Sequence, residues 1–128
     1  MPNLLETASN WLQEQRKTHW SREVVYRRDL YNATVAATVG RTVFEQDDGV
    51  GTIIRTEVRD YLIDVEDLVL PKIGQVLPER GDKIEESQGS QRFIYEVVSI
   101  GSEPHWRFSD PYRKTLRIHT KHIDTEAI

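Results

Sequence analysis

The fold is decided by the stretch RGDKIEESQGSQRFIYEVVSI, residues 80–100. A short strand that carries Ile84 runs into Ser87-Gln88-Gly89-Ser90, and a long apolar strand follows. A short loop with glycine between two such runs predicts a β-hairpin. The second run has apolar side chains on both faces: Phe93, Tyr95 and Val97 on one, and Ile94, Val98 and Ile100 on the other. Because both faces need cover, we expect this strand at the centre of a sheet.

Alternating patterns predict further strands along most of the chain. They fall at residues 23–28, 33–39, 42–45, 52–64 and 115–123. A bend or bulge is expected at Gly40. In the longest strand, Arg55, Glu57 and Arg59 are expected to form a row on one exposed face. About six short strands favour a small antiparallel β-barrel, because closure hides the strand edges.

One amphipathic helix is expected before the strands, at residues 3–18, with Asn3 as its N-cap. Its apolar stripe consists of Leu4, Leu5, Ala8, Trp11 and Leu12. Two interpretations are open: the helix caps the end or side of the barrel, or it packs on a neighbouring subunit. The predicted fold class is therefore mainly β (α+β) in one domain, residues 1–128, with the barrel at 21–123 and a frayed tail at 124–128.

Composition restricts the function. The chain has 128 residues, 38% hydrophobic and 30% charged, which suits one folded domain with a modest core. It lacks cysteine, a membrane-length apolar run and a secretory signal, so we expect a reducing compartment or a particle assembled inside a cell. The net charge of −4 argues against a protein that grips nucleic acid mainly through phosphates.

No motif predicts catalysis, a cofactor or a metal site. His119 and His122 lie three apart on a predicted strand, so they should face opposite sides. His105, close to Asp110, is a possible acid/base pair, which leaves a small hydrolase or metal enzyme as a third hypothesis. The acidic turn Asp47, Asp48, Gly49, Val50 and Gly51 lacks the alternating ligands of an EF-hand and is predicted to be a solvated hairpin turn.

Two segments are candidates for contacts with a partner. The first breaks regular structure yet is apolar, through Leu70, Ile73, Val76 and Leu77. The second is rich in the residue types of interface hot spots: Trp106, Arg107, Phe108, Tyr112 and Arg113. The second segment has two other interpretations, a plug of the barrel core and a surface on which nucleic-acid bases stack.

Several of these residues resemble a known family. The strand with Tyr26-Arg27-Arg28, the turn 48–51, and Gly81-Asp82-Lys83-Ile84 followed by QRFIYEVVSI resemble small head–tail joining proteins of tailed bacteriophages. A hairpin of the form G-D-x-I … G … Y-x-V recurs in that family. Residues 59–63 and 106–113, the latter running into 116–121, look like a prophage-borne branch. The likeness covers residues 24–123 and does not include the N-terminal helix.

The resemblance implies a structural subunit without enzymatic activity or cofactor. It implies a homo-oligomeric ring below the portal, as a head-completion, stopper or adaptor protein. Its partners would be further copies of itself and the portal and tail proteins, with DNA passing through without specific binding. Its place would be the head–tail interface of the virion, and the host cytoplasm before assembly. By position, residues 45–52 and 73–79 would be loops that order when the ring forms. The runner-up is a small β-barrel module that binds nucleic acid.

Overall fold

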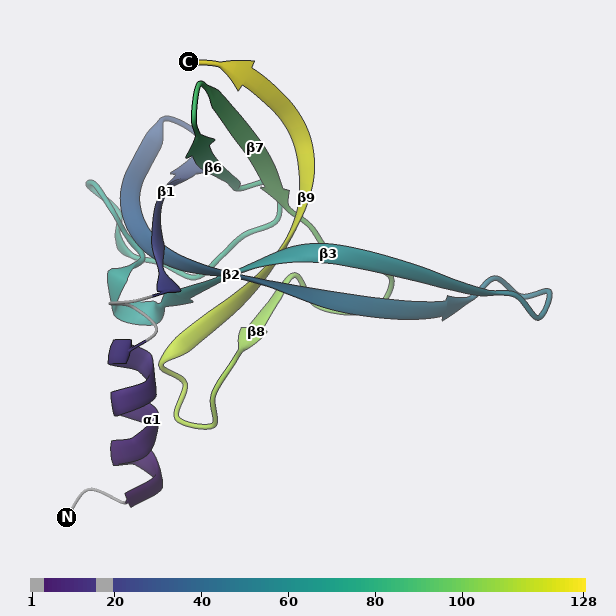
Figure 1. Cartoon of the computed structure of the whole chain (residues 1–128), viewed down its shortest axis with the longest axis horizontal. Helices are drawn as coiled ribbons and strands as arrows, with labels where there is room; N and C mark the ends of the chain where they lie inside the picture. Colours follow the sequence, from purple (N-terminus) through teal and green to yellow (C-terminus); the bar gives the residue numbers. More distant parts are fainter. Residues whose placement is uncertain (1–3, 16–19) are drawn as a thin grey trace.

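The computed structural model describes residues 4–15 and 20–128 (Figure 1). The predicted helix ends, including the Asn3 cap, lie outside these residues. The elements are α1 (Leu4–Gln15), β1 (Arg22–Arg28), β2 (Tyr31–Asp47), β3 (Ile53–Asp64), the 3₁₀ turn η2 (Val65–Asp67), β4 (Val69–Leu70), β5 (Gly74–Gln75), β6 (Lys83–Gln88), β7 (Gln91–Val97), β8 (Trp106–Phe108) and β9 (Thr115–Ala127).

The main sheet closes on itself. Its strand order is β3-β2-β1-β6-β7-β9-β8, and an additional pairing joins β3 to β9. Six strands therefore form a closed antiparallel circuit, and β8 adds to the side of β9 that also carries β7. The predicted fold, mainly β with one N-terminal helix, is confirmed.

The β6–β7 hairpin is central, as the sequence predicted. Gln88 pairs with Gln91 across a two-residue turn, and Gly89 at its first position has φ +60°. Glycine adopts that angle at the lowest cost, which favours a tight hairpin turn here. On either side, β6 pairs with β1 and β7 pairs with β9. The hairpin thus joins the two halves of the sheet.

Side chains from all six strands of the circuit fill its interior. The largest fully buried apolar ones are Tyr26, Tyr61, Ile63, Leu68, Leu70, Ile84, Leu116 and Ile118. Each such side chain stabilises the fold by roughly 1.5–3 kcal/mol relative to an exposed position. Trp106 and Phe108 pack edge to face, 5.0 Å apart, against this core.

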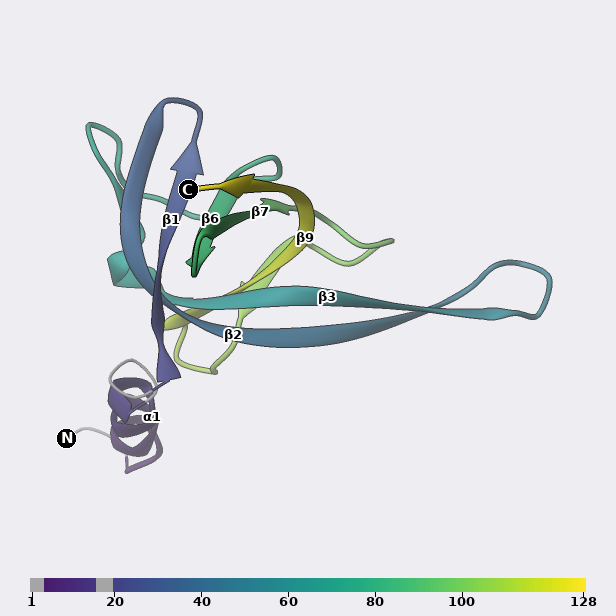
Figure 2. The same ribbon diagram turned by 45° about the horizontal axis from the view of Figure 1, so that its top comes forward.

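A long hairpin, the arm (residues 41–58), leaves the closed sheet (Figures 1 and 2). β2 pairs with β1 up to Ala37 and with β3 from Thr38 onward. Beyond Gly40 no third strand among the described residues pairs with the arm. Of the bend or bulge expected at Gly40, the bulge is wrong, since the β2–β3 register runs through this residue unbroken. Glycine instead gives room: a Cβ there would lie 3.3 Å from Nη1 of Arg117.

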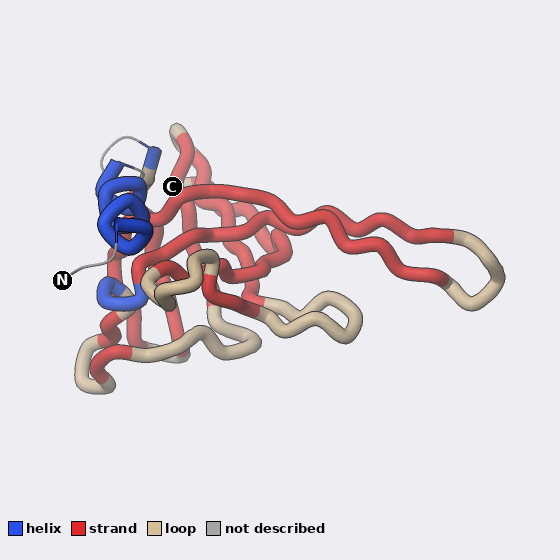
Figure 3. Tube along the Cα trace, turned by 90° about the horizontal axis from the view of Figure 1, so that it is seen from below, coloured by secondary structure: helices blue, strands red, loops and turns tan. Residues whose placement is uncertain are grey.

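The helix and the C-terminus differ from expectation. Helix α1 stands at one end of the sheet, opposite the arm (Figure 3), and buries none of its side chains. It meets the rest of the chain through its polar side, where Glu6 lies 3.1 Å from Lys114 and Asn10 accepts a hydrogen bond from Lys114. Trp11, which the amphipathic pattern would bury, is 59% exposed, so the helix does not cap the barrel. The predicted frayed tail is wrong too, because residues 124–127 pair with β7 as the end of β9.

Candidate assembly surfaces

The tip of the arm is a compact acidic turn. Asp47 Oδ1 accepts a hydrogen bond from Gly49 N at 2.9 Å, and Asp48 Oδ1 accepts from Val50 N and Thr52 N at 3.0 and 3.1 Å. These bonds hold the turn in one conformation and place Val50, 84% exposed, at its apex. The prediction of a hairpin turn is confirmed. A hydrogen-bonded turn with an exposed apolar apex is suited to contact another surface.

The arm also exposes apolar side chains along its length: Val43, Ile53 and Ile54. Two exposed ion pairs cross it, Arg41–Glu57 at 3.3 Å and Glu45–Arg55 at 3.4 Å. Exposed ion pairs of this kind stabilise a folded structure by well under about 1 kcal/mol each. They therefore favour the β2–β3 register but do not fix the arm to the rest of the sheet. Much of the apolar surface of the arm is therefore not covered by the rest of the chain.

The predicted exposed row of Arg55, Glu57 and Arg59 is wrong at its last member. Arg59 lies where β3 joins β9, and its side chain is only 29% exposed. It points inward because the same face of β3 continues with Tyr61, which is fully buried. The row thus passes from solvent into the interior at the root of the arm.

Arg59 reaches a buried carboxylate, Glu86, whose side chain is 1% exposed. Nη2 of Arg59 donates to both Glu86 oxygens at 2.9 Å, and the Tyr61 hydroxyl donates at 2.9 Å. Arg22 and Gln88 also donate to it. Burial alone would raise the pKa of Glu86, but the hydrogen bonds from Arg59, Gln88 and Tyr61 outweigh it and lower the pKa. Glu86 is therefore charged and joins its own strand, β6, to β1 and β3.

A second buried carboxylate, Asp60, fixes the outer side of the same root. Its oxygens lie 2.7 Å from Nδ1 of His119 and 2.7 Å from Nη1 of Arg117, and Thr42 donates to it. Burial would raise the pKa of Asp60, but the hydrogen bonds from these partners outweigh it and lower the pKa. Phe44 covers the His119 ring edge to face at 5.3 Å. β2, β3 and β9 are thereby joined where the arm departs.

The third is Asp82, in the turn before β6. Arg28 donates to its carboxylate through Nε at 3.1 Å and Nη2 at 2.9 Å, and the Tyr26 hydroxyl donates as well. The Glu79 amide donates to the same carboxylate at 3.0 Å and closes the turn. The Gly81-Asp82-Lys83-Ile84 motif is thus a structural joint between β1 and β6.

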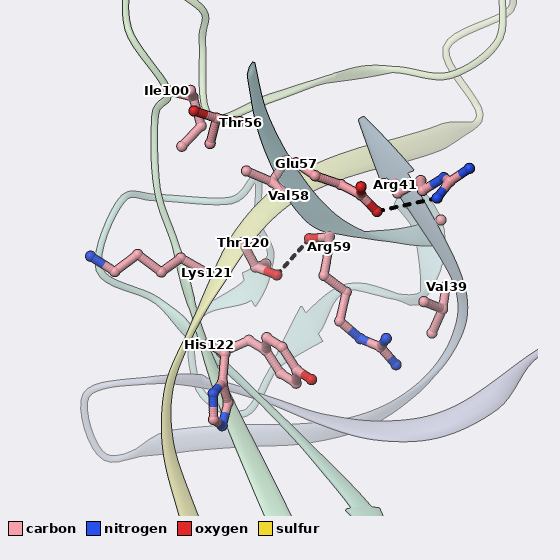
Figure 4. A pocket seen from close by; sticks show the side chains of 12 residues that line it. Val39, Arg41, Thr56, Glu57, Val58, Arg59, Ile100, Thr120, Lys121 and His122 are labelled. Atoms are coloured by element: carbon pink, nitrogen blue, oxygen red, sulfur yellow. Dashed lines mark hydrogen bonds and ion pairs between the residues drawn. The ribbon is translucent and has the colours of Figure 1, made fainter. Parts of the chain in front are cut away.

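A groove of about 750 Å³ opens at the root of the arm (Figure 4). It lies where β3 and β9 diverge, because their pairing ends at Arg59 and Thr120. Its lining consists of Val39, Gly40, Arg41, Thr56, Glu57, Val58, Arg59, Tyr95, Ile100, Thr120, Lys121 and His122. Among these are three cations and one carboxylate, and most of the lined surface is apolar.

The predicted contact residues divide into buried and exposed groups. Leu70 is 1% exposed and lies in the core, so it is wrong as an interface candidate. Val76, Trp106 and Phe108 are partly buried against that core. The others reach the surface to different degrees: Ile73, Leu77, Arg107 and Arg113 are exposed, and Tyr112 is half-buried beneath Lys114.

The structure does not bring His105 and Asp110 together as an acid/base pair. Nε2 of His105 lies 2.8 Å from the Pro78 carbonyl oxygen. Asp110 accepts from the amides of Tyr112, Lys114 and Thr115 and shapes the turn before β9. Within residues 4–15 and 20–128, no group of three His, Asp or Glu side chains is placed to hold a metal ion. No helix in the part of the chain that the structure describes could span a bilayer.

Comparison with known proteins identifies the family. A family model described as phage head-tail joining protein matches residues 2–127. The chain belongs to the phage head-tail joining protein family. No curated protein matches it significantly. The resemblance inferred from the hairpin motif is confirmed, and the match includes the N-terminal helix that the motif comparison left out. The family supports a structural role in the phage particle, in contact with other head and tail proteins.

The three buried carboxylates described above, Asp60, Asp82 and Glu86, were missed by the sequence analysis. A signal was present, because Asp82 and Glu86 share the phase of Ile84, which faces the core. An acidic residue at an inward position predicts a buried partner, and the chain offers arginines at matching positions in neighbouring strands. Asp60 gave a weaker signal, since it lies in a run of mixed charge.

Proposed function

We propose that this protein is a subunit of a homo-oligomeric ring between portal and tail, around the channel through which DNA passes. The observation that carries the proposal is the arm: a rigid hairpin with an acidic tip and exposed apolar side chains, projecting from a closed and well-fixed sheet (Figure 2). Its apolar side chains Val43, Val50, Ile53 and Ile54 stay exposed in the single subunit. Such exposure fits a chain whose contacts are with neighbours.

Membership of the head–tail joining family supports the place of this ring. The net charge of −4 agrees with it, because a basic channel would retain DNA through its phosphates. The apolar stripe of α1 and the exposed residues Ile73, Leu77, Arg107 and Arg113 are the proposed contacts with neighbours. Before assembly the subunit would be in the host cytoplasm, and afterwards in the virion.

Electron microscopy of the purified protein mixed with portal complexes of the same phage tests the proposal. We expect an added ring of density at the tail-facing end of the portal. Portal complexes that remain bare at saturating subunit concentration would refute it.

The alternative of a nucleic-acid-binding module has less support. Trp106 and Phe108, proposed as stacking residues, pack against the core and each other. Titration with fluorescent single-stranded DNA separates the two functions, because a phosphate-driven module would bind in a steeply salt-dependent way.

A further inference from the structure

Strand edges at the root of the arm are left unpaired. β9 pairs with β3 only up to Thr120, and within residues 4–15 and 20–128 no strand takes the β3 side of β9 beyond that point. The corresponding edge of β3 is also unpaired over residues 53–58. Open edges of this kind are templates for an added strand. The groove of about 750 Å³ is the space between them.

The tip of the arm is complementary to this groove in charge and in apolar character. Its tip presents two carboxylates, Asp47 and Asp48, around an apolar apex at Val50. The groove combines apolar walls with three cations, Arg41, Arg59 and Lys121. Arg41 and Arg59 form ion pairs with Glu57 and the buried Glu86, so the groove keeps a net positive charge of one, from Lys121. Charge and apolar character are therefore complementary between tip and groove.

A chain cannot satisfy this complementarity with its own arm. The root of the arm forms one wall of the groove, through Arg41 and residues 56–59. Val50 lies six residues from Thr56, the lining residue on β3 that is nearest the tip, or about 20 Å at roughly 3.4 Å per residue. A two-stranded hairpin with continuous register does not fold back over that distance. The occupant of the groove must come from another molecule.

We infer that the arm tip of one copy, centred on Val50, docks in the root groove of the next copy, beside the free edge of β9. The contact is head to tail, because each copy offers a different surface to each of its two neighbours. A head-to-tail contact generates a ring when the rotation closes. The inference rests on the proposed ring and names the contact that would build it.

Cysteine cross-linking tests this contact in a chain that contains no cysteine of its own. One population carries Val50→Cys at the tip, and a second, differently tagged population carries His122→Cys, an exposed position in the groove. The two are mixed, assembled with portal complexes and oxidised gently. We expect a disulfide-linked dimer that carries both tags, at about twice the chain mass of 14.9 kDa.

The matched control replaces the groove cysteine by Leu30→Cys, which is 93% exposed in the β1–β2 turn. It should give less than about a tenth of the cross-linked product. Equal cross-linking of both groove and control variants, or of Val50→Cys to the portal instead, overturns the docking. A ring on the portal without any mixed dimer also overturns it and leaves the proposed function intact. Absence of both ring and portal binding overturns the function itself.

A second variant, Val50→Glu, adds charge to an exposed apex and leaves the core untouched. We expect it to fold as the unchanged protein does, by circular dichroism and urea midpoint, and to need at least tenfold more subunit to coat the portal. Unchanged coating by a folded Val50→Glu subunit contradicts the inference.

Discussion

The buried Glu86 gives the sharpest prediction about stability. Glu86→Gln keeps the shape of the side chain and removes its charge, which leaves Arg59 and the Tyr61 hydroxyl facing a weaker acceptor. Both donors bond to Glu86 at 2.9 Å, and the carboxylate is 1% exposed. Removing one partner of a buried pair costs about 3–5 kcal/mol. We expect the lower end, about 3 kcal/mol, because Arg59 is partly exposed and can turn toward water.

Arg22 adds little to this figure. Its side chain is nearly half exposed, so its ion pair with Glu86 resembles a surface pair of a few tenths of a kcal/mol. For a domain of this size, a loss of about 3 kcal/mol lowers the melting temperature by roughly 10 °C. Urea unfolding followed by circular dichroism measures the change as a lower midpoint at unchanged slope.

The matched control is Glu57→Gln. Glu57 forms an ion pair with Arg41 on the exposed arm, and both side chains are more than half exposed. We expect a change below about 0.5 kcal/mol. A double-mutant cycle with Arg59→Met should show coupling of at least about 1 kcal/mol with Glu86→Gln. Two results would refute the assignment of Glu86 as a buried link between β6 and β3: additive effects of Arg59→Met and Glu86→Gln, or equal effects of Glu57→Gln and Glu86→Gln.

Three further outcomes are expected. Asp82→Asn should lower the free energy of unfolding by about 2 kcal/mol in urea titrations, because it weakens charge-assisted hydrogen bonds from Arg28 and the Glu79 amide. An unchanged urea midpoint would exclude Asp82 as a joint between β1 and β6. Trp11→Ala should change the midpoint by less than about 0.5 kcal/mol, since its side chain is largely exposed, and a larger loss would mean that α1 packs on the sheet. Folding lowers the pKa values of Asp60 and Glu86, so the stability they contribute is complete above their pKa values in the unfolded chain, near about 4. That stability is lost as the pH falls through their pKa values in the folded protein. The unfolding free energy, measured from pH 6 to pH 2, should therefore fall below about pH 4, and the fall should be shallower in Glu86→Gln.

Local patterns predicted the closed sheet well, because side-chain alternation and glycine turns are properties of short segments. The β6–β7 hairpin is the clearest case: apolar residues on both faces of β7 required cover, and the sheet supplies it. Alternation says nothing about where a strand loses its neighbour. β2 has the same pattern before and after Ala37, yet its pairing with β1 stops there, and its pairing with β3 continues into the arm.

The helix shows a second limit. An amphipathic stripe predicts that something covers it, without saying whether the cover is in the same chain. Leu4, Leu5, Trp11 and Leu12 are all exposed, and the polar side of α1 contacts Lys114. The alternative interpretation, contact with a neighbouring subunit, stays a prediction. The prediction of Leu70 as a contact residue was wrong for the opposite reason. An apolar segment with two prolines was interpreted as surface, but Leu68 and Leu70 lie in the core.

The placement of the uncovered surfaces constrains how copies can associate. A twofold dimer through α1 would cover the helix in both copies and leave every arm tip and every root groove empty, because the arm extends away from the helix (Figure 3) and the groove lies at the root of the arm. A twofold dimer that paired tip with tip would set two acidic turns against each other, which is unfavourable. A twofold exchange, in which the tip of each copy enters the groove of the other, would fill both sites in a dimer, and the mass of the assembly separates it from a ring. A head-to-tail contact fills one groove and covers one tip in each copy, and only closure leaves no terminal copy with either unfilled. In such a ring the proposed contact would not involve the apolar stripe of α1, which would remain for contact with a further protein.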